Sequence, residues 1–439
     1  MSDQPVQAGE PAAHARDDSG ESPADRDRDG GDGYARRWLE PPRLRTAPGA
    51  DEAERHVTWL ELFYDLVFVV AVAQLAHELN DDDLSVGGLL AFAALFVPVW
   101  WAWVGATVYA TRFDTDDAVH RALTLLAMLA VGALASNVHD GAGANAMGFA
   151  LAYVAVRAVL IVEYLRAGRH VPAAAPLTTR YAVGIAAAAA LWLLAAFAPP
   201  PARYLLWALA LAVDLAVPAS AGGQLARIPP SGSHLPERFG LFTIIVLGEA
   251  VVAVTGGVAD QAWRPASAVT AALGLTLAFG LWWIYFGVFD GAALRRAARA
   301  GRVGLFLAWL YLHLPLVIGL AAIGVGVERA VTSPEGATLA AAERWLLCGA
   351  VALCLLAIGA IHLTVHAVGA AVATRREAAY HAVAAAAALT LAAVGERLPP
   401  AVLMGALALA CAALVAVDLP APRGRPGAGE DRGPPMSVE

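Results

Sequence analysis

Apolar stretches long enough to cross a membrane recur along most of the chain. After residue 57, runs of about twenty apolar residues alternate with short polar segments, and about twenty residues is the length that an α-helix needs to span a bilayer. We therefore expect an all-α integral membrane protein with almost no soluble domain. The pattern predicts about twelve transmembrane helices, near residues 58–79, 86–108, 119–138, 144–165, 180–198, 203–218, 239–256, 267–289, 304–328, 344–368, 377–395 and 400–418.

Composition agrees with this pattern and excludes an ordinary soluble protein. Of the 439 residues, 59% are hydrophobic and only 15% are charged, whereas soluble domains carry about 25% charged residues. The net charge is −8, but much of it lies in the polar segment 1–56, so we expect no nucleic-acid partner. Residues 1–56 and the Pro/Gly/Arg-rich residues 420–439 are predicted to be disordered cytoplasmic tails, and the polar start cannot form a signal peptide.

The arginines predict an orientation for the helices. If the N-terminus is inside, thirteen arginines fall in or beside the inside loops between the predicted helices, and five fall outside. Basic residues favour cytoplasmic loops. We therefore expect both termini to be cytoplasmic.

Polar and aromatic landmarks recur in the same order in both halves of the chain. Glu61-Leu62-Phe63 opens the first predicted helix and Glu237-Arg238-Phe239 the seventh, while Trp100-Trp101 lies in the second and Trp282-Trp283 in the eighth. The order predicts two six-helix repeats. Their predicted ranges are 57–218 and 239–419, with 219–238 as a cytoplasmic linker.

Six helices is an even number, so the two repeats are predicted to be parallel. Repeats of this kind can enclose a pathway at their interface; the alternative is a duplicated bundle that only packs. The two tryptophan pairs fit either interfacial belts or packing between the repeats.

Ionisable side chains inside a span cost about 2.5–3.5 kcal/mol on insertion scales, so each one needs a reason. Glu61 and Asp65 are four residues apart, on one helical face. Helical rise places Asp65 about 10 Å, and Arg157 about 12 Å, from the cytoplasmic side. We predict that Arg157 forms an ion pair with Asp65 or Glu61. The pair would be either a structural lock or part of a gate or proton-coupled pathway.

Other polar residues in the spans are further candidates for an ion or substrate pathway. Glu249 lies near the middle of its helix, as a proton or cation site or as a neutral acid bonded to a neighbouring helix. His313 and His362 lie in apolar helices, where polar packing or titration in a cavity is expected. Asp214 lies near a cytoplasmic helix end and is predicted to be an interfacial anchor.

No pattern of an enzyme is present in the sequence, and the signal for a metal site is weak. His362 and His366 are four residues apart, a spacing that can bind a metal, but no Cys or HExxH pattern accompanies them. The cysteines Cys348, Cys354 and Cys411 lie in apolar segments without metal or disulfide spacing. We find no HExxH, phosphate loop, CxxC or nucleophile elbow. We therefore expect no cofactor, no metal and no enzyme activity, with an intramembrane lipid-modifying enzyme as the lesser alternative.

Two motifs carry a resemblance to a known family. The segment 58–69, TWLELFYDLVFV, resembles the E-L-F-[FY]-D-L-V-F-V signature of the bacterial low-temperature-requirement A (LtrA) family, and 237–249, ERFGLFTIIVLGE, resembles its second signature. The likeness extends over about 57–419. It implies a multi-pass protein of the bacterial cell membrane, linked genetically to growth in the cold, and supplies no established molecular activity. The motif residues are Glu61, Phe63, Asp65, Glu237, Arg238, Phe239, Gly240, Gly248 and Glu249.

A more distant likeness concerns endolysosomal potassium channels and their bacterial relatives. The segment 63–68, FYDLVF, followed by Glu78, is similar to their F-S-D-G-V-F…E pattern. Those proteins also build six-helix units, duplicated in the eukaryotic forms. Here Tyr64 replaces the serine and the second half has no matching aspartate, so the resemblance does not predict a symmetric filter.

Taken together, these features favour a channel or transporter for an ion or small solute, with the lipid bilayer as its constant partner. The alternative is a non-transporting structural or sensory membrane protein. The sequence does not indicate an oligomeric state.

Overall fold

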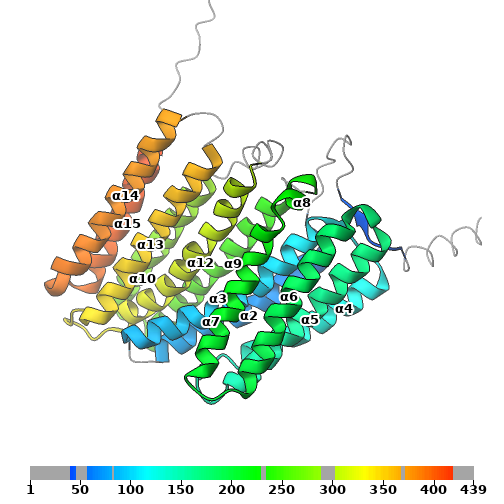
Figure 1. Ribbon diagram of the computed structural model, residues 1–439. Helices are drawn as coiled ribbons and strands as arrows, with labels where there is room; N and C mark the ends of the chain where they lie inside the picture. Colours follow the sequence, from blue (N-terminus) through cyan, green and yellow to red (C-terminus); the bar gives the residue numbers. More distant parts are fainter. Residues whose placement is uncertain are drawn as a thin grey trace, which may run out of the picture.

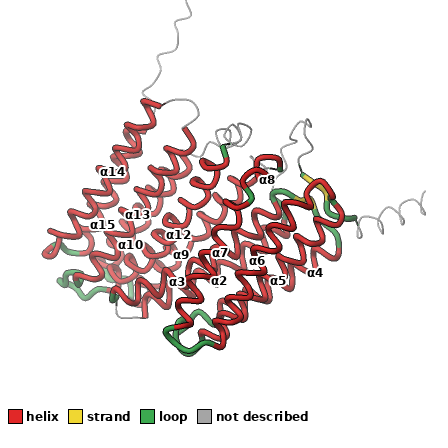
Figure 2. The backbone as a smooth tube through the Cα atoms, viewed as in Figure 1, coloured by secondary structure: helices red, strands yellow, loops and turns green. Residues whose placement is uncertain are grey.

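A computed structural model describes residues 40–45, 57–81, 84–228, 234–287, 302–366 and 371–418. In these ranges twelve helices are long and apolar enough to cross a membrane. The predicted all-α integral membrane fold with about twelve spans is therefore confirmed. The helices stand side by side (Figure 1), and a single short strand pair is the only sheet among the described residues (Figure 2).

The first half of the chain contains six of the long helices and two short helical turns. The long helices are α2 (Trp59–Asp81), α3 (Val86–Ala110), α4 (Ala118–Ser136), α5 (Ala146–His170), α6 (Ala175–Phe197) and α7 (Ala202–Ser220). The short 3₁₀ turn η1 (Pro172–Ala174) precedes α6, and α8 (Gly222–Arg227) follows α7.

The second half contains the other six long helices. They are α9 (His234–Asp260), α10 (Pro265–Gly287), α12 (Val303–Thr332), α13 (Ala341–His366), α14 (Ala371–Val394) and α15 (Pro400–Asp418), with the 3₁₀ turn η2 (Gly395–Arg397) between the last two.

The same order of neighbouring helices occurs in both halves. In the first, α2 packs on α3 and α4, and α4, α5, α6 and α7 pack in succession; in the second, α9 packs on α10 and α12, and α12, α13, α14 and α15 pack in succession. This is the order that a duplication predicts, and the two-repeat arrangement itself stays a prediction. The halves meet where α2 and α3 contact α9 and α12.

The two tryptophan pairs have different environments. The Trp101 ring stacks on Tyr311 of α12 with 5.6 Å between centroids. Trp282 and Trp283 of α10 are 38% and 41% exposed. Packing between the halves is therefore found for the first pair and not for the second.

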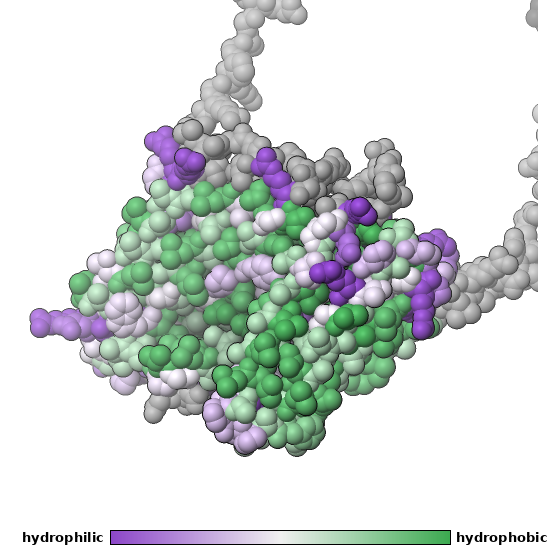
Figure 3. Space-filling view, viewed as in Figure 1, coloured by the Kyte–Doolittle hydropathy of each residue, from purple (hydrophilic) through white to green (hydrophobic). Residues whose placement is uncertain are grey.

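The outer surface of the bundle is apolar. Phe197, Leu205 and Leu409 are 70%, 71% and 70% exposed. On the face seen in Figure 3, apolar side chains cover the middle of the helices and hydrophilic ones gather toward the helix ends. A surface of this kind is what a bilayer requires and far exceeds the apolar patches of soluble monomers.

Part of the predicted N-terminal tail is ordered. The strand β1 (Arg43–Leu44) pairs antiparallel with β2 (Phe113–Asp114), which directly follows α3. The prediction of disorder is therefore wrong for residues 40–45, because backbone pairing holds them against the end of α3. The rest of segment 1–56 and residues 419–439 lie outside the described residues.

The predicted linker 219–238 ends earlier in the chain than expected. The helix α9 begins at His234 rather than at 239. Polar residues made this stretch look like a loop, but His234 and Arg238 are 2% and 1% exposed. They belong to a buried network described below, and this contact extends the helix.

Candidate functional site

A capping box places Glu61 at the start of α2. The Thr58 hydroxyl accepts a hydrogen bond from the Glu61 N–H at 3.3 Å, and Glu61 Oε2 accepts one from the Thr58 N–H at 3.0 Å. The T-x-x-E spacing favours this reciprocal pair at a helix start. The local sequence therefore holds the Glu61 carboxylate at the start of α2, where its other contacts are made.

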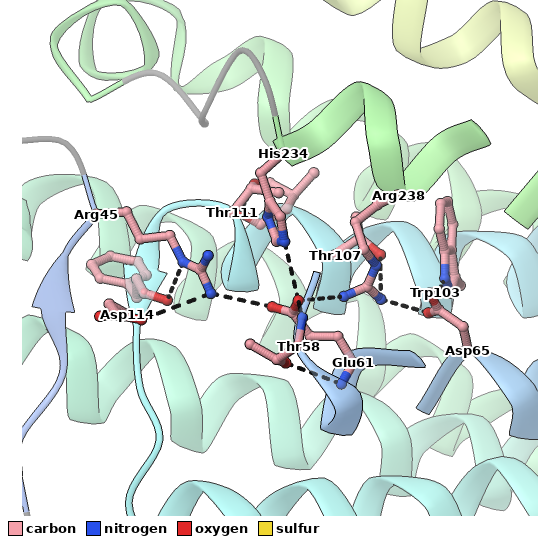
Figure 4. A network of polar contacts seen from close by, with 12 residues as sticks. Arg45, Thr58, Glu61, Asp65, Trp103, Thr107, Thr111, Asp114, His234 and Arg238 are labelled. Carbon is pink, nitrogen blue, oxygen red and sulfur yellow. Dashed lines mark hydrogen bonds and ion pairs between the residues drawn. The ribbon is translucent and has the colours of Figure 1, made fainter. Parts of the chain in front are cut away.

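Two arginines and one histidine surround the Glu61 carboxylate (Figure 4). Arg45 Nη2, just after β1, lies 3.2 Å from Oε1, and His234 Nε2 lies 3.0 Å from Oε2. Arg238 Nη1 is 3.6 Å from the same Oε2. The carboxylate thus receives groups from the N-terminal segment and from α9.

Asp65 lies one turn further along α2, on the same face, and is fully buried. Its Oδ1 accepts hydrogen bonds from Arg238 Nη2 at 2.5 Å and from Trp103 Nε1 at 2.7 Å. A buried carboxylate is costly unless it is paired and hydrogen-bonded. Arg238 comes from the second half of the chain, so this pair joins the two halves at their interface.

The predicted ion pair between Arg157 and Asp65 or Glu61 is wrong. Arg157 Nη2 lies 2.8 Å from Asp214 Oδ2 of α7, and both side chains are 1% exposed. The Tyr153 hydroxyl donates to Asp214 at 2.7 Å and accepts from Arg157 Nε at 2.8 Å. Equal depth in the membrane did not decide which helix was the neighbour, and Asp214 is not the predicted interfacial anchor.

A cavity of about 70 Å³ lies beside Glu61. One water needs roughly 10–15 Å³ of such space, so the cavity has room for several. Small side chains on α3, at positions 102, 106 and 110, form one wall because residues four apart share a helical face. The ionisable side chains that line it are Glu61, His120, Glu163 and Arg238.

His120 and Glu163 form a second polar pair at this cavity. His120 Nδ1 is 2.9 Å from Glu163 Oε1. Asp117 caps α4, accepts the His120 N–H at 3.2 Å and pairs with Arg166 at 2.7 Å. Glu163 Oε2 has no hydrogen-bond partner among the described residues. Glu163 also interacts electrostatically with the Tyr109 hydroxyl, which lines the same cavity. A carboxylate at a cavity can take a proton, a water or a cation.

Polar side chains also gather at the other end of α2. Asn80 donates to Glu328 of α12 at 3.1 Å, and Arg329 donates to Asn80 Oδ1 at 3.1 Å. Glu249 of α9 is half-buried and interacts electrostatically with Glu328. The predicted candidate Glu249 is therefore close to another carboxylate that its own sequence neighbours did not reveal.

The structure does not bring the two candidate histidines to the cavity. His313 is buried, and its Nε2 forms a hydrogen bond with the Tyr285 hydroxyl at 3.1 Å. Its ring lies against Phe239, with 4.8 Å between the ring centroids. His362 is buried on α13, with its ring 5.1 Å from that of His381. Neither lines the cavity beside Glu61. Both are therefore part of helix packing in this conformation.

The remaining motif residues divide between core and surface. Phe239 is 2% exposed, whereas Phe63 is 56% exposed. A Cβ at Gly248 would meet no atom within 4 Å, so this glycine is not needed for close helix approach. Gly240 is buried and Glu237 lies in the first turn of α9.

Several residues of the site were missed in the sequence. His234 falls within the predicted linker 219–238, and His120 and Glu163 lie at the ends of the predicted helices 119–138 and 144–165. The T-x-x-E spacing at 58–61 was a usable signal for the start of α2. Among the residues with described positions, no three His, Cys, Asp or Glu side chains are placed to hold a metal.

Comparison with known proteins agrees with the two motifs. Residues 56–417 match the family described as bacterial low temperature requirement A protein (LtrA). The chain is also similar to an uncharacterized protein of Rhizobium meliloti (strain 1021), with 28% identity over 306 residues that cover 64% of this chain and 74% of the relative. Because the family match covers most of the chain, including both motifs and all twelve spans, this protein belongs to the bacterial LtrA family of multi-pass membrane proteins.

Proposed function

We propose that this protein is a channel or transporter for an ion or small solute, and that its activity is coupled to protons. The observation that carries the proposal is the cavity beside Glu61. The cavity is partly open and is not an enclosed void of the protein interior. A bundle that served only for packing has no need to keep about 70 Å³ open next to four ionisable side chains.

The chemistry of the cavity lining supports movement of a proton or cation. Glu61, Glu163 and His120 face one space, and ionisable residues inside membrane spans commonly mark ion pathways and proton relays. Carboxylates and imidazole can exchange protons with water in the cavity. Arg238 would set the field there and limit how many cations enter at once.

The second polar cluster supports a path along the interface of the two halves. Asn80 is fifteen residues beyond Asp65 on α2, which corresponds to about 22 Å of helix. Glu249 and Glu328 lie at that far end. Of the described residues, neither Asp65 nor Glu249 lines the cavity beside Glu61. The proposed path is therefore closed between the two polar clusters in this conformation. A conformational change has to open it before an ion or solute can pass.

Flux into liposomes tests the proposal directly. Purified protein would be reconstituted with a pH-sensitive dye inside, and steps of pH, K⁺, Na⁺ and Cl⁻ would be applied. We expect flux under at least one gradient. Glu163→Gln should lower it about tenfold or more, because the isosteric amide keeps the shape but cannot exchange a proton.

Glu396→Gln is the matched control, since the Glu396 side chain is 67% exposed on the loop before α15. Its flux should equal that of the unmodified protein. Absence of flux under every gradient, with the protein folded in the liposomes, would rule the proposal out.

A non-transporting structural or sensory protein is the second candidate function. It is favoured by the ion pair of Arg238 with Asp65, which ties the two halves together by buried charges. In that case the polar network would serve assembly, and Glu163→Gln would change stability without any flux to lose.

We also propose that both termini are cytoplasmic and that the protein lies in the bacterial cell membrane. The thirteen arginines of the predicted inside loops support this orientation. Labelling of single cysteines placed at positions 40 and 336 in intact cells would test it. Position 336 should react with an impermeant reagent and position 40 should not.

A further inference from the structure

Arg112 is a buried arginine just after the end of α3. It lies between the second and third predicted helices, where a loop arginine is expected to face water, yet the side chain is only 2% exposed. Its guanidinium lies over the Tyr181 ring at 5.1 Å, and Nη2 donates a weak hydrogen bond to the Tyr181 hydroxyl at 3.4 Å. Nε and Nη1 have no hydrogen-bond partner among the described residues.

The charge of Arg112 is not balanced by a carboxylate. Within the described part of the chain no acidic oxygen pairs with it, and Asp214, which lines the same cavity as Arg112, pairs with Arg157. A guanidinium does not lose its proton in proteins, and an unpaired buried charge is strongly unfavourable. A ring face and a neutral hydroxyl lower this cost without removing it.

Arg112 lines a small cavity. The cavity measures about 20 Å³ and is lined by Arg112, Arg157, Tyr164, Tyr181 and Asp214, with Phe306 and Leu310 of α12 closing it from the second half. The Tyr164 hydroxyl interacts with Arg112, whose guanidinium can only donate, so the hydroxyl's own proton has no acceptor among the described residues. Two guanidinium groups face one carboxylate, so the lining has one positive charge in excess.

The geometry points to a binding site for one small monovalent anion, such as chloride, between Arg112 and Tyr164. Donors without acceptors select a ligand that only accepts hydrogen bonds, and the excess positive charge selects an anion over water. The space exceeds the roughly 10–15 Å³ that one water needs but is too small for a phosphate ester or a larger solute. This site is separate from the proposed cation path, since the cavity beside Glu61 has a different lining apart from Leu160.

Anion-dependent stability tests the site. The purified full-length protein in detergent would be heated in chloride, bromide, formate or gluconate at constant ionic strength. We expect the Tm to rise by about 2–5 °C with chloride or bromide, with saturation, and not with gluconate. The Tm in formate shows whether the site also accepts a small carboxylate or only a spherical anion.

Arg112→Met should abolish the response, because the charge that attracts the anion is gone. Tyr164→Phe removes one donor and should weaken the anion affinity about three- to tenfold. Arg180→Gln is the matched control, since Arg180 is an exposed arginine on the neighbouring α6. It should respond to chloride as the unmodified protein does.

If Arg112→Met fails to fold, the unmodified protein still decides the question. Crystals grown in sodium bromide should show an anomalous peak in contact with the Arg112 guanidinium. An unmodified protein whose Tm is the same in chloride and gluconate would overturn the proposal. So would a rise that never saturates and is equal in Arg112→Met, since that is a general salt effect.

Discussion

The two buried arginine networks differ in what they connect. Arg157 pairs with Asp214 on a helix of the same half, and one tyrosine hydroxyl completes the pair. Arg238 instead reaches from the second half to both Asp65 and Glu61 of the first. The first network is a local lock, and the second lies at the interface between the halves, beside the larger of the two cavities described above.

The difference shows which charges are available for function. In the Arg157 network one arginine pairs with one carboxylate, so neither side chain has an alternative charged partner within the network. In the Arg238 network two carboxylates share one deeply buried arginine, with Arg45 and His234 contributing at the edge. Such shared networks can rearrange between alternative partners, whereas a closed pair can only be kept or broken.

The largest expected effect is the loss of Arg238. Arg238→Met would leave Asp65 buried with Trp103 as its remaining donor, and we expect the free energy of unfolding to fall by about 5 kcal/mol. Unfolding in detergent measures it. Adding Asp65→Asn should restore more than half of the loss. If Arg238→Met alone is as stable as the unmodified protein, the Arg238 network does not hold the halves together.

Loss of Arg157 should lower the free energy of unfolding somewhat less, and a second substitution at its partner Asp214 should restore it. Arg157→Met leaves one unpaired carboxylate, at a cost of about 3–4 kcal/mol, while Arg157→Met together with Asp214→Leu should be close to the unmodified protein. The same unfolding measurement and the liposome flux should be recorded. If the double variant also loses flux, the contrast drawn between a lock and a functional network fails.

The smallest effect is expected at Gly105, which lies against the Arg157 network. A Cβ there would come within 2.7 Å of Arg157 Nη1 and 2.8 Å of Leu160 Cδ2. Gly105→Ala should cost about 1–2 kcal/mol, because both side chains have to shift. Gly132→Ala is the control, since its Cβ would meet nothing within 4 Å; it should be neutral or stabilising. Equal results for the two variants would show that the packing around Arg157 is loose.

The spans could be predicted from the sequence and the polar contacts could not. Twenty apolar residues are a local property, and the bilayer imposes their length, so helix positions followed directly. The partner of Arg157 depends on which helices are neighbours. Depth along the membrane normal does not tell which helix is the neighbour, and only the packing of both α5 and α7 on α6 brings Asp214 beside Arg157.

The site was predicted in part for the same reason. Glu61 and Asp65 stood out because they are polar residues in an apolar helix. Arg238 stood out only as a residue of the second motif and His234 not at all, because polar residues at a helix start look the same whether they face water or a buried carboxylate. Arg112 shows the converse, since an arginine that fits a loop count is in fact enclosed by aromatic rings.

The short strand β1, before the first span, decides how far the N-terminus can be shortened without changing the Glu61 network. Arg45 reaches Glu61 because residues 43 and 44 pair with the end of α3. A version cut back to the first apolar residue would keep every span and still lack a direct contact of the Glu61 carboxylate. Truncations that remove residues 43–45, and binding proteins that displace them, would therefore act on the interior of the bundle. The smallest version with the complete Glu61 network should begin upstream of the membrane domain that hydropathy outlines.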